Sequence, residues 1–307
     1  MSAIEIRNFS KNYGDVAAVR GLSFTVQEGE LFGLIGPDGA GKTTTMRTLC
    51  TLLACEQGEM FVSGLDVHQE ISQIRALLGY MPQRFSLYPD LSVKQNLDFF
   101  AALFGVPKQE KQKQLQKLYQ FSKLQPFENR LAGALSGGMK QKLALSCTLI
   151  HTPKILILDE PTTGVDPVSR REFWQILNQL KREGVTILVS TPYMDEADLC
   201  DRVAFMHKGR VLALDTPDRL HRYFDFALYE VVAADMRSLV PFFSTEGKAL
   251  SVQIFGDRLH VSFNATLDER SVKRMTKEAP VAIDSFKSIK PSTEDTFLAL
   301  MQKQEVD

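Results

Sequence analysis

A glycine-rich loop ending in a lysine, GPDGAGKTT at residues 36–44, has the residue types that hold phosphate groups. It follows the apolar run LFGLIG and leads into the helical pattern TTTMRTLCTLL, so the context predicts a nucleotide-binding P-loop. Glycines let backbone amides close around phosphates at a helix start. Lys42 adds a positive charge, Thr43 should place its hydroxyl on Mg²⁺, and Asp38 should turn its carboxylate outward. The residues expected to line this loop are Gly36, Pro37, Asp38, Gly39, Ala40, Gly41, Lys42, Thr43 and Thr44.

Two adjacent acids end the apolar run ILILDEP at 155–161. Asp159 is placed to hold magnesium through water, and Glu160 to polarise an attacking water as a general base. A strand followed by two acids is weak evidence alone. Combined with the P-loop, it indicates hydrolysis of a nucleoside triphosphate.

A second possible anion site lies in LSGGMKQKLAL at 135–145, where Ser136 and two glycines open a helical pattern. The alternative is an ordinary cap on a core helix. One chain cannot easily wrap both sites around one triphosphate, but a second protomer can.

The surrounding elements alternate in the manner of an α/β fold. The apolar runs at 31–36, 77–82, 154–160 and 184–190 are typical of a buried parallel sheet. A mostly helical insertion lies between 83 and 135. From about residue 225 the pattern becomes strand, helix, strand, strand, helix, strand and a final helix, with a turn at Gly256 and Asp257. This βαββαβ order predicts a ferredoxin-like unit.

The composition excludes several classes of protein. The net charge of the 307 residues is -1, which does not indicate a nucleic-acid-coating protein or a polybasic membrane binder. The sequence shows no secretory signal and no apolar run near the ~18 residues that span a bilayer. The cysteines lack zinc-site spacing, so we expect buried thiols of a cytosolic protein.

Together, the P-loop, Gln83, LSGGMKQ, ILILDEP and GVDP resemble the nucleotide-binding subunit of ATP-binding cassette (ABC) transporters. The resemblance implies a P-loop ABC ATPase domain over 1–224, with a helical signature subdomain at about 84–150. Residues 225–307 would form a small α+β accessory or regulatory domain. Its end, PSTEDTFLALM, looks like the tail of bacterial multidrug-export ATPases of the daunorubicin-resistance type.

The resemblance also implies roles for single residues. Tyr13 would stack on adenine, and Gln83 would reach the magnesium and sense a transmembrane partner. Asp166 would lie at a dimer interface. The residues expected to contact the γ-phosphate held by the opposite protomer are Ser136, Gly137 and Gly138.

The cofactors implied are ATP and Mg²⁺, with Thr43, Gln83 and Asp159 as the metal-binding residues. The implied partners are a separate transmembrane subunit and a second ABC cassette, with no nucleic acid. The protein would be cytoplasmic, on the inner face of the cell membrane through its transmembrane partner only.

One position departs from the family pattern. After the run VTILVS the family has Thr-His, whose imidazole bonds the γ-phosphate, but this sequence has Thr191 and Pro192. Thr191 can cap a helix that starts at Pro192, so the backbone can keep its shape. Tyr193 is a poor substitute because adjacent helix positions point ~100° apart. We therefore expect a degenerate ATP site and favour a heterodimer, with a homodimer possible.

Three functions remain in competition. The first is the ATPase subunit of an exporter. The second is an ATP-dependent regulatory clamp with little turnover, which the missing histidine favours and Glu160 opposes. The third is a soluble ABC protein of DNA repair or translation. Repair proteins of this kind have long coiled-coil arms and translation factors have two cassettes per chain, and the sequence has neither feature.

Overall fold

The structure is a computed structural model that describes residues 2–84, 87–245 and 249–306. The chain divides into two compact units, Met1–Pro217 and Asp218–Asp307. Residues 1, 85–86, 246–248 and 307, which fall within the predicted domain ranges, lie outside the described residues. Among the described residues, no helix has the length and apolar character needed to cross a membrane.

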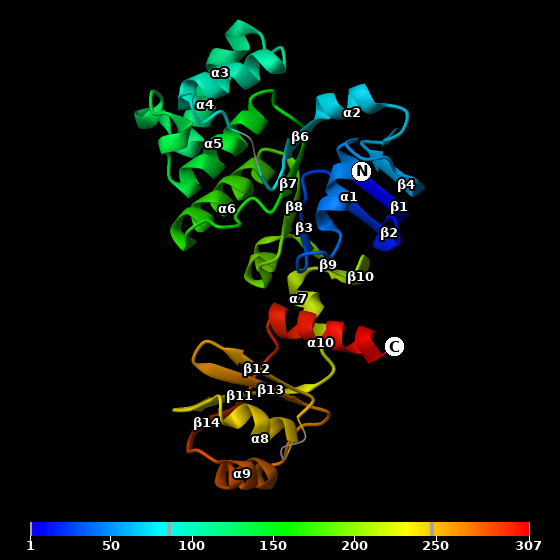
Figure 1. The fold of residues 1–307 in the computed structure, drawn as a ribbon, viewed down its shortest axis with the longest axis vertical. Helices are drawn as coiled ribbons and strands as arrows, with labels where there is room; N and C mark the ends of the chain where they lie inside the picture. Colours follow the sequence, from blue (N-terminus) through cyan, green and yellow to red (C-terminus); the bar gives the residue numbers. More distant parts are fainter. Residues whose placement is uncertain (1, 85–86, 246–248, 307) are drawn as a thin grey trace. The chain divides into compact units, whose positions relative to one another are not determined.

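The first unit is built on a six-stranded sheet with the order β10-β9-β3-β8-β7-β6 (Figure 1). Every neighbouring pair is parallel except β9 and β10. The strands are β3 (Leu31–Ile35), β6 (Leu78–Met81), β7 (Ile155–Asp159), β8 (Thr186–Thr191), β9 (Arg202–His207) and β10 (Arg210–Asp215). The predicted parallel sheet is confirmed. Parallel strands end at one edge, so the loops after β3, β7 and β8 meet there.

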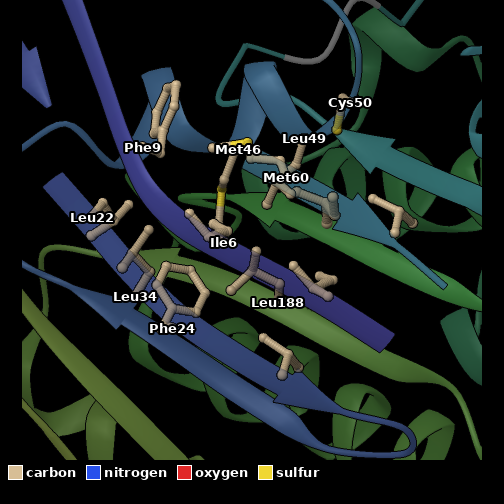
Figure 2. Close-up of a cluster of buried hydrophobic side chains, with 14 of the residues drawn as sticks. Ile6, Phe9, Leu22, Phe24, Leu34, Met46, Leu49, Cys50, Met60 and Leu188 are labelled. Carbon is tan, nitrogen blue, oxygen red and sulfur yellow. The ribbon is translucent and has the colours of Figure 1, made fainter. Parts of the chain in front are cut away.

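An antiparallel sheet with the order β2-β1-β4-β5 covers the parallel sheet and was not predicted. Its strands are β1 (Ser2–Tyr13), β2 (Val16–Gln27), β4 (Gln57–Val62) and β5 (Leu65–Asp66). Figure 2 shows the core, where side chains of this sheet, of helix α1 (Lys42–Leu49) and of the parallel sheet come together. Its labelled members are Ile6, Phe9, Leu22, Phe24, Leu34, Met46, Leu49, Cys50, Met60 and Leu188. Burying each large apolar side chain contributes about 1.5 to 3 kcal/mol, so this core fixes α1 beside β3.

The predicted helical insertion is present over its described residues. Ser92 begins α3 (Val93–Leu103) with a capping box, and about half of the residues of α4 (Lys108–Ser122) are exposed. The helices of the first unit are α1 (Lys42–Leu49), α2 (Ile71–Leu77), α3 (Val93–Leu103), α4 (Lys108–Ser122), α5 (Gly137–Leu149) and α6 (Pro167–Arg182). Short 3-10 helices are η1 (Gln125–Phe127), η2 (Ala132–Ala134) and η3 (Met194–Leu199).

The second unit has the predicted ferredoxin-like order. Its sheet, β12-β13-β11-β14, is antiparallel throughout. The elements are η4 (His221–Tyr223), β11 (Ala227–Ala233), α8 (Leu239–Thr245), β12 (Ser251–Phe255), β13 (Arg258–Phe263), α9 (Glu269–Glu278), β14 (Ile283–Ser288) and α10 (Thr293–Val306). A short helix, α7 (Pro217–Leu220), spans the division between the units.

The division between the units comes earlier than the predicted boundary at 224/225. The second unit begins at Asp218. η4 contacts α10, and Asp225 pairs with Lys303 of α10, so the residues around 221–225 pack with the second unit.

Candidate functional site

The P-loop connects β3 to α1, and two of its positions require glycine. A Cβ atom at Gly36 would lie 2.1 Å from the carbonyl oxygen of Met206, so no larger residue fits. Gly41 has φ 103°, and a Cβ there would lie 2.6 Å from the carbonyl oxygen of Ala18. Gly41 is also the N-cap of α1 and supplies no side chain, so the first amides of the helix are left for another acceptor.

Lys42 is buried inside this loop, with 3% of its surface exposed. Its ammonium group donates hydrogen bonds to the carbonyl oxygens of Gly36 (2.7 Å) and Pro37 (3.0 Å). It also forms an ion pair with Glu160 Oε1 at 3.0 Å. An ammonium group has three donors, and these oxygens account for all of them. A nucleotide phosphate would compete for the same donors.

Asp159, at the end of β7, is fully buried beside the P-loop. Its Oδ1 accepts hydrogen bonds from Thr43 Oγ1 (3.1 Å) and Ser190 Oγ (2.8 Å). Its Oδ2 has no hydrogen-bond partner among the described residues. Burial raises the pKa of this carboxyl, against the lowering effect of the two hydroxyl donors.

The oxygen groups at Asp159 fit a magnesium ion. Mg²⁺ prefers oxygen ligands and usually keeps several waters, so one carboxylate and one hydroxyl suffice. The unpartnered Oδ2 of Asp159 and the hydroxyl of Thr43 are such ligands. No group of three or more His, Cys, Asp or Glu side chains in the described part of the chain is arranged to hold a metal.

Glu160 has an unusual backbone conformation for a residue other than glycine, with φ 50°. Such conformations cost about 1 to 3 kcal/mol and persist where the surroundings fix them. Its N–H donates to the carbonyl oxygen of Ser190 at 3.1 Å. Its Oε2 accepts from Gln83 Nε2 (2.8 Å) and Thr163 Oγ1 (3.4 Å). The carboxylate is thus held between Gln83 and Lys42.

These residues face a cavity of about 640 Å³. Predicted residues lining it are Asp38, Gly39, Ala40, Gly41, Lys42, Thr43, Thr44, Gln83 and Glu160. Asp38 is exposed, as expected for an outward carboxylate. Arg20 and Lys208 also line the cavity and were missed, because they lie in no motif. A separate cavity of about 580 Å³, near the amino ends of β7 and β8, contains none of the predicted residues.

Tyr13 lies apart from this group. It ends β1 with 49% of its surface exposed, its ring 6.0 Å from the ammonium nitrogen of Lys11. Tyr13 is not among the described residues that line the cavity. Val16, its partner in the β1–β2 hairpin, does line it. Its contact with adenine stays a prediction.

The signature residues lie at the start of α5, against α6. Ser136 caps α5 by accepting the amide of Met139 at 3.4 Å. A Cβ on Gly138 would come within 2.4 Å of Ser169 Cβ, so this glycine allows the helices to approach. Asp166 caps α6 and accepts the amide of Ser169 at 2.9 Å, a hydrogen bond that lowers the pKa of Asp166. None of Ser136, Gly137, Gly138 and Asp166 is among the described residues lining the P-loop cavity.

The loop after β8 differs from the prediction. Thr191 accepts the amide of Tyr193 on its hydroxyl (3.1 Å), but η3 begins only at Met194, with Tyr193 as its N-cap. Pro192 therefore precedes the helix instead of starting it, because Thr191 Oγ1 closes a tight turn across the proline. The Arg170 guanidinium lies 4.0 Å from the centre of the Tyr193 ring, so this side chain is engaged with α6.

Comparisons with known proteins show the family of this chain. A family model described as ABC transporter matches residues 19–163. Nod factor export ATP-binding protein I of Rhizobium etli is 34% identical over 311 residues, covering 99% of this chain and 95% of that protein. The chain belongs to the ABC transporter ATP-binding proteins. The predicted family and fold class are confirmed.

Other ABC transporter proteins match over different shares of their length. Daunorubicin resistance ATP-binding protein DrrA2 of Streptomyces coeruleorubidus is 33% identical, with 97% of this chain and 94% of that protein covered. The probable multidrug ABC transporter ATP-binding protein YbhF of Escherichia coli is 43% identical over 219 residues, 71% of this chain. The match spans 38% of YbhF. A solved structure, the dimeric structure of the bacterial ABC transporter cassette MJ0796, has a TM-score of 0.64 and 26% identity, with 69% of this chain and 98% of that one covered.

Proposed function

We propose that this chain is the ATP-binding and ATP-hydrolysing subunit of an ABC exporter. The observation that carries the proposal is the meeting of Lys42, Glu160 and Gln83 at the cavity formed by the P-loop. Relatives over the whole length of the chain are named for Nod factor export and daunorubicin resistance. These names support export as the process that ATP hydrolysis drives.

The residues would share the reaction as follows. The P-loop amides and Lys42 would hold the phosphates, and Glu160 would accept a proton from the attacking water. Thr43, Gln83 and Asp159 would hold Mg²⁺. The bound ion would neutralise charge on the phosphates.

A second cassette would complete the site. Ser136, Gly137 and Gly138 lie at a helix start away from their own P-loop cavity, which suits contact with a nucleotide on another protomer. Asp166 would lie at that interface, and Tyr13 would stack on adenine. The similar cassette MJ0796 is described as dimeric.

The remaining partner would be a separate transmembrane subunit. The described residues include no membrane-spanning helix, so the membrane would be reached through that subunit, at its cytoplasmic face. The net charge of -1 gives no support for nucleic-acid binding.

The chain's own ATP site would be degenerate at Pro192. The P-loop amide of Gly36 donates to the carbonyl oxygen of Thr191 at 3.2 Å, so residue 192 follows directly where β8 meets the P-loop. A histidine there could donate to a phosphate, but proline has no side-chain donor. We favour a heterodimer, in which a partner cassette supplies the complete P-loop site and this chain supplies an intact LSGGMKQ.

A regulatory clamp with little turnover is the second candidate, favoured by the same proline. Steady-state ATP hydrolysis by the purified chain, by Pro192→His and by Glu160→Gln tests the proposal. A missing transition-state contact costs about 10²- to 10³-fold in rate, so the wild type should be slow, Pro192→His faster and Glu160→Gln slower than wild type. A wild-type rate equal to that of a histidine-bearing cassette assayed alongside, with no gain in Pro192→His, would contradict the degenerate site. Absence of hydrolysis in every variant, with ATP still bound, would favour the clamp.

A further inference from the structure

Four side chains connect the loop after β8 to α6 and to the loop after β7. They are Thr162, Arg170, Tyr193 and Glu196, which we call the brace. Thr162 Oγ1 donates a hydrogen bond to Glu196 Oε1 at 2.8 Å. Arg170 Nε lies 3.6 Å from the same oxygen, at ion-pair distance but too far for a hydrogen bond. The Arg170 guanidinium also stacks on the Tyr193 ring.

Glu196 is the centre of the brace and is 1% exposed. A buried carboxylate is costly unless it is paired and hydrogen-bonded. Here Oε1 has both a hydroxyl donor and a guanidinium, while Oε2 has no hydrogen-bond partner among the described residues. The contacts of Oε1 with Thr162 and Arg170 connect the loop after β8 to the loop after β7 and to α6.

Arg170 is held from several sides. Besides Tyr193 and Glu196, its Nη1 lies 3.6 Å from Asp195 Oδ2, which is 75% exposed and therefore adds little. The stacked Tyr193 ring and the buried Glu196 fix the direction of the guanidinium. The loop from 191 to 196 is thereby attached to the first turn of α6.

Thr162, one of the brace residues, is two positions after Glu160 in the sequence. Glu160 is held on the β8 side by Ser190, and Thr163 donates to its carboxylate. Thr162 lies between Glu160 and Thr163 in the sequence, and its hydroxyl donates to Glu196. The left-handed backbone of Glu160 needs such support on both sides to persist.

We propose that the brace positions Glu160 for attack of water on ATP, so that Glu196 and Arg170 are positioning residues. With proline at 192, the loop after β8 contributes to hydrolysis through its brace contacts with the loop that carries Glu160. This inference rests on the proposed function.

The test compares Glu196→Ala with Glu196→Gln, and Arg170→Ala with Arg170→Lys, in the full-length chain. Glu196→Ala should lower kcat about tenfold, the factor expected for one lost hydrogen bond to a charged group, with KM and the Kd for ATP unchanged within about twofold of the wild type. Gln still accepts from Thr162, so Glu196→Gln should restore most of kcat. Arg170→Ala should also lower kcat, and Arg170→Lys should do so less. Arg171→Ala, an exposed neighbour on α6, is the matched control and should leave kcat unchanged.

A second readout does not depend on hydrolysis. Amide hydrogen exchange over residues 158–164 should become faster in Glu196→Ala and stay slow in Glu196→Gln and Arg171→Ala. Trp174, the single tryptophan of the sequence, lies one turn after Arg170 on α6 and reports by its fluorescence whether the fold is kept.

Several results would overturn the inference. An unchanged kcat in Glu196→Ala, an equal loss in the Gln variant, or a KM that moves together with kcat would each remove the positioning role. If the wild type hydrolyses no ATP, the proposed function fails, and the positioning role fails with it. Hydrogen exchange still shows separately whether the brace holds the Glu160 loop, and unchanged exchange in Glu196→Ala would exclude it.

Discussion

At the scale of single residues, Lys42 is the buried cation that we propose holds a phosphate in the P-loop cavity. Its contacts with Gly36, Pro37 and Glu160 keep a full positive charge buried in the loop. A buried ammonium group is tolerated there because carbonyl and carboxylate oxygens of the protein accept its hydrogen bonds. A triphosphate would meet both this ammonium and the amides at the start of α1.

Replacing Lys42 should therefore weaken ATP binding more than replacing any surface lysine. Hydrogen bonds to charged groups contribute about 1.5 to 3 kcal/mol, so Lys42→Ala should raise the Kd for Mg-ATP about 10- to 100-fold. Lys154→Ala, an exposed lysine at the other end of β7, is the control. Isothermal titration calorimetry measures both. Equal Kd values for the two variants would contradict the assignment of the P-loop.

The sequence predicted the residues of the site better than their contacts. The P-loop and the two acids at the end of β7 were predicted from residue type and spacing. Two acids after a strand are weak evidence alone, but they indicate a nucleotide site when a P-loop occurs in the same chain. The ion pair of Lys42 with Glu160 and the turn across Pro192 could not be predicted, because both depend on how separate loops meet at one edge of the sheet. The roles of Tyr13 and Asp166 stay predictions.

At the scale of elements, the approach of α5 to α6 depends on one glycine. The helix starts meet where Gly138 faces Ser169, and a Cβ atom at 138 would lie 2.4 Å from Ser169 Cβ. At Gly137, the nearest atom to an added Cβ is 3.8 Å away, an ordinary contact. Gly137 and Gly138 are adjacent, but only position 137 has space for a Cβ atom.

Gly138→Ala should destabilise the first unit, and Gly137→Ala should not. Overpacking of this kind costs about 1 to 3 kcal/mol, and a methyl in open space within a helix is neutral or favourable. Thermal unfolding followed by Trp174 fluorescence compares the two variants, since Trp174 lies on α6. Similar melting temperatures for both variants would show that α6 moves aside without cost.

Elements with a regular pattern were predicted from the sequence, and irregular ones were not. The strands of the parallel sheet are apolar on both faces, which makes them visible as short apolar runs. The sheet of β1, β2, β4 and β5 was missed because register shifts interrupt its alternation. The helix α10 was predicted, but its capping box was not. Ser292 and Asp295, in the pattern S-x-x-D, each accept the backbone amide of the other.

At the scale of the whole molecule, the chain contains two units with separate cores, and each has its own buried charge. In the second unit, α10 is attached to β13 by His260 Nδ1 and Asp295 Oδ1, 2.8 Å apart. Asp295 Oδ2 accepts the amide and the hydroxyl of Ser292. Burial alone would raise the pKa of Asp295, but the hydrogen bonds from His260 and Ser292 outweigh it and leave the pKa below its ordinary value.

Asp295→Asn should therefore destabilise the second unit at neutral pH without changing ATP affinity. A carboxyl whose pKa falls on folding stabilises the folded state above its unfolded pKa of about 3.9, and this contribution is lost as the pH falls through the lower, folded pKa. The difference between wild type and Asp295→Asn should be about 1.5 to 3 kcal/mol at pH 7 and should shrink as the pH falls below about 3.9. Asp257→Asn, at an exposed carboxylate, should differ little from wild type.

Calorimetric unfolding of the full chain over this pH range measures the difference in stability. Hydrogen exchange of β13 identifies which unit unfolds. Titration with Mg-ATP at pH 7 completes the test, because every residue proposed to bind nucleotide belongs to the first unit. A difference that persists unchanged below the folded pKa would show that Asp295 acts through packing and not through its charge. A weaker Kd for ATP in Asp295→Asn would show that the second unit takes part in nucleotide binding.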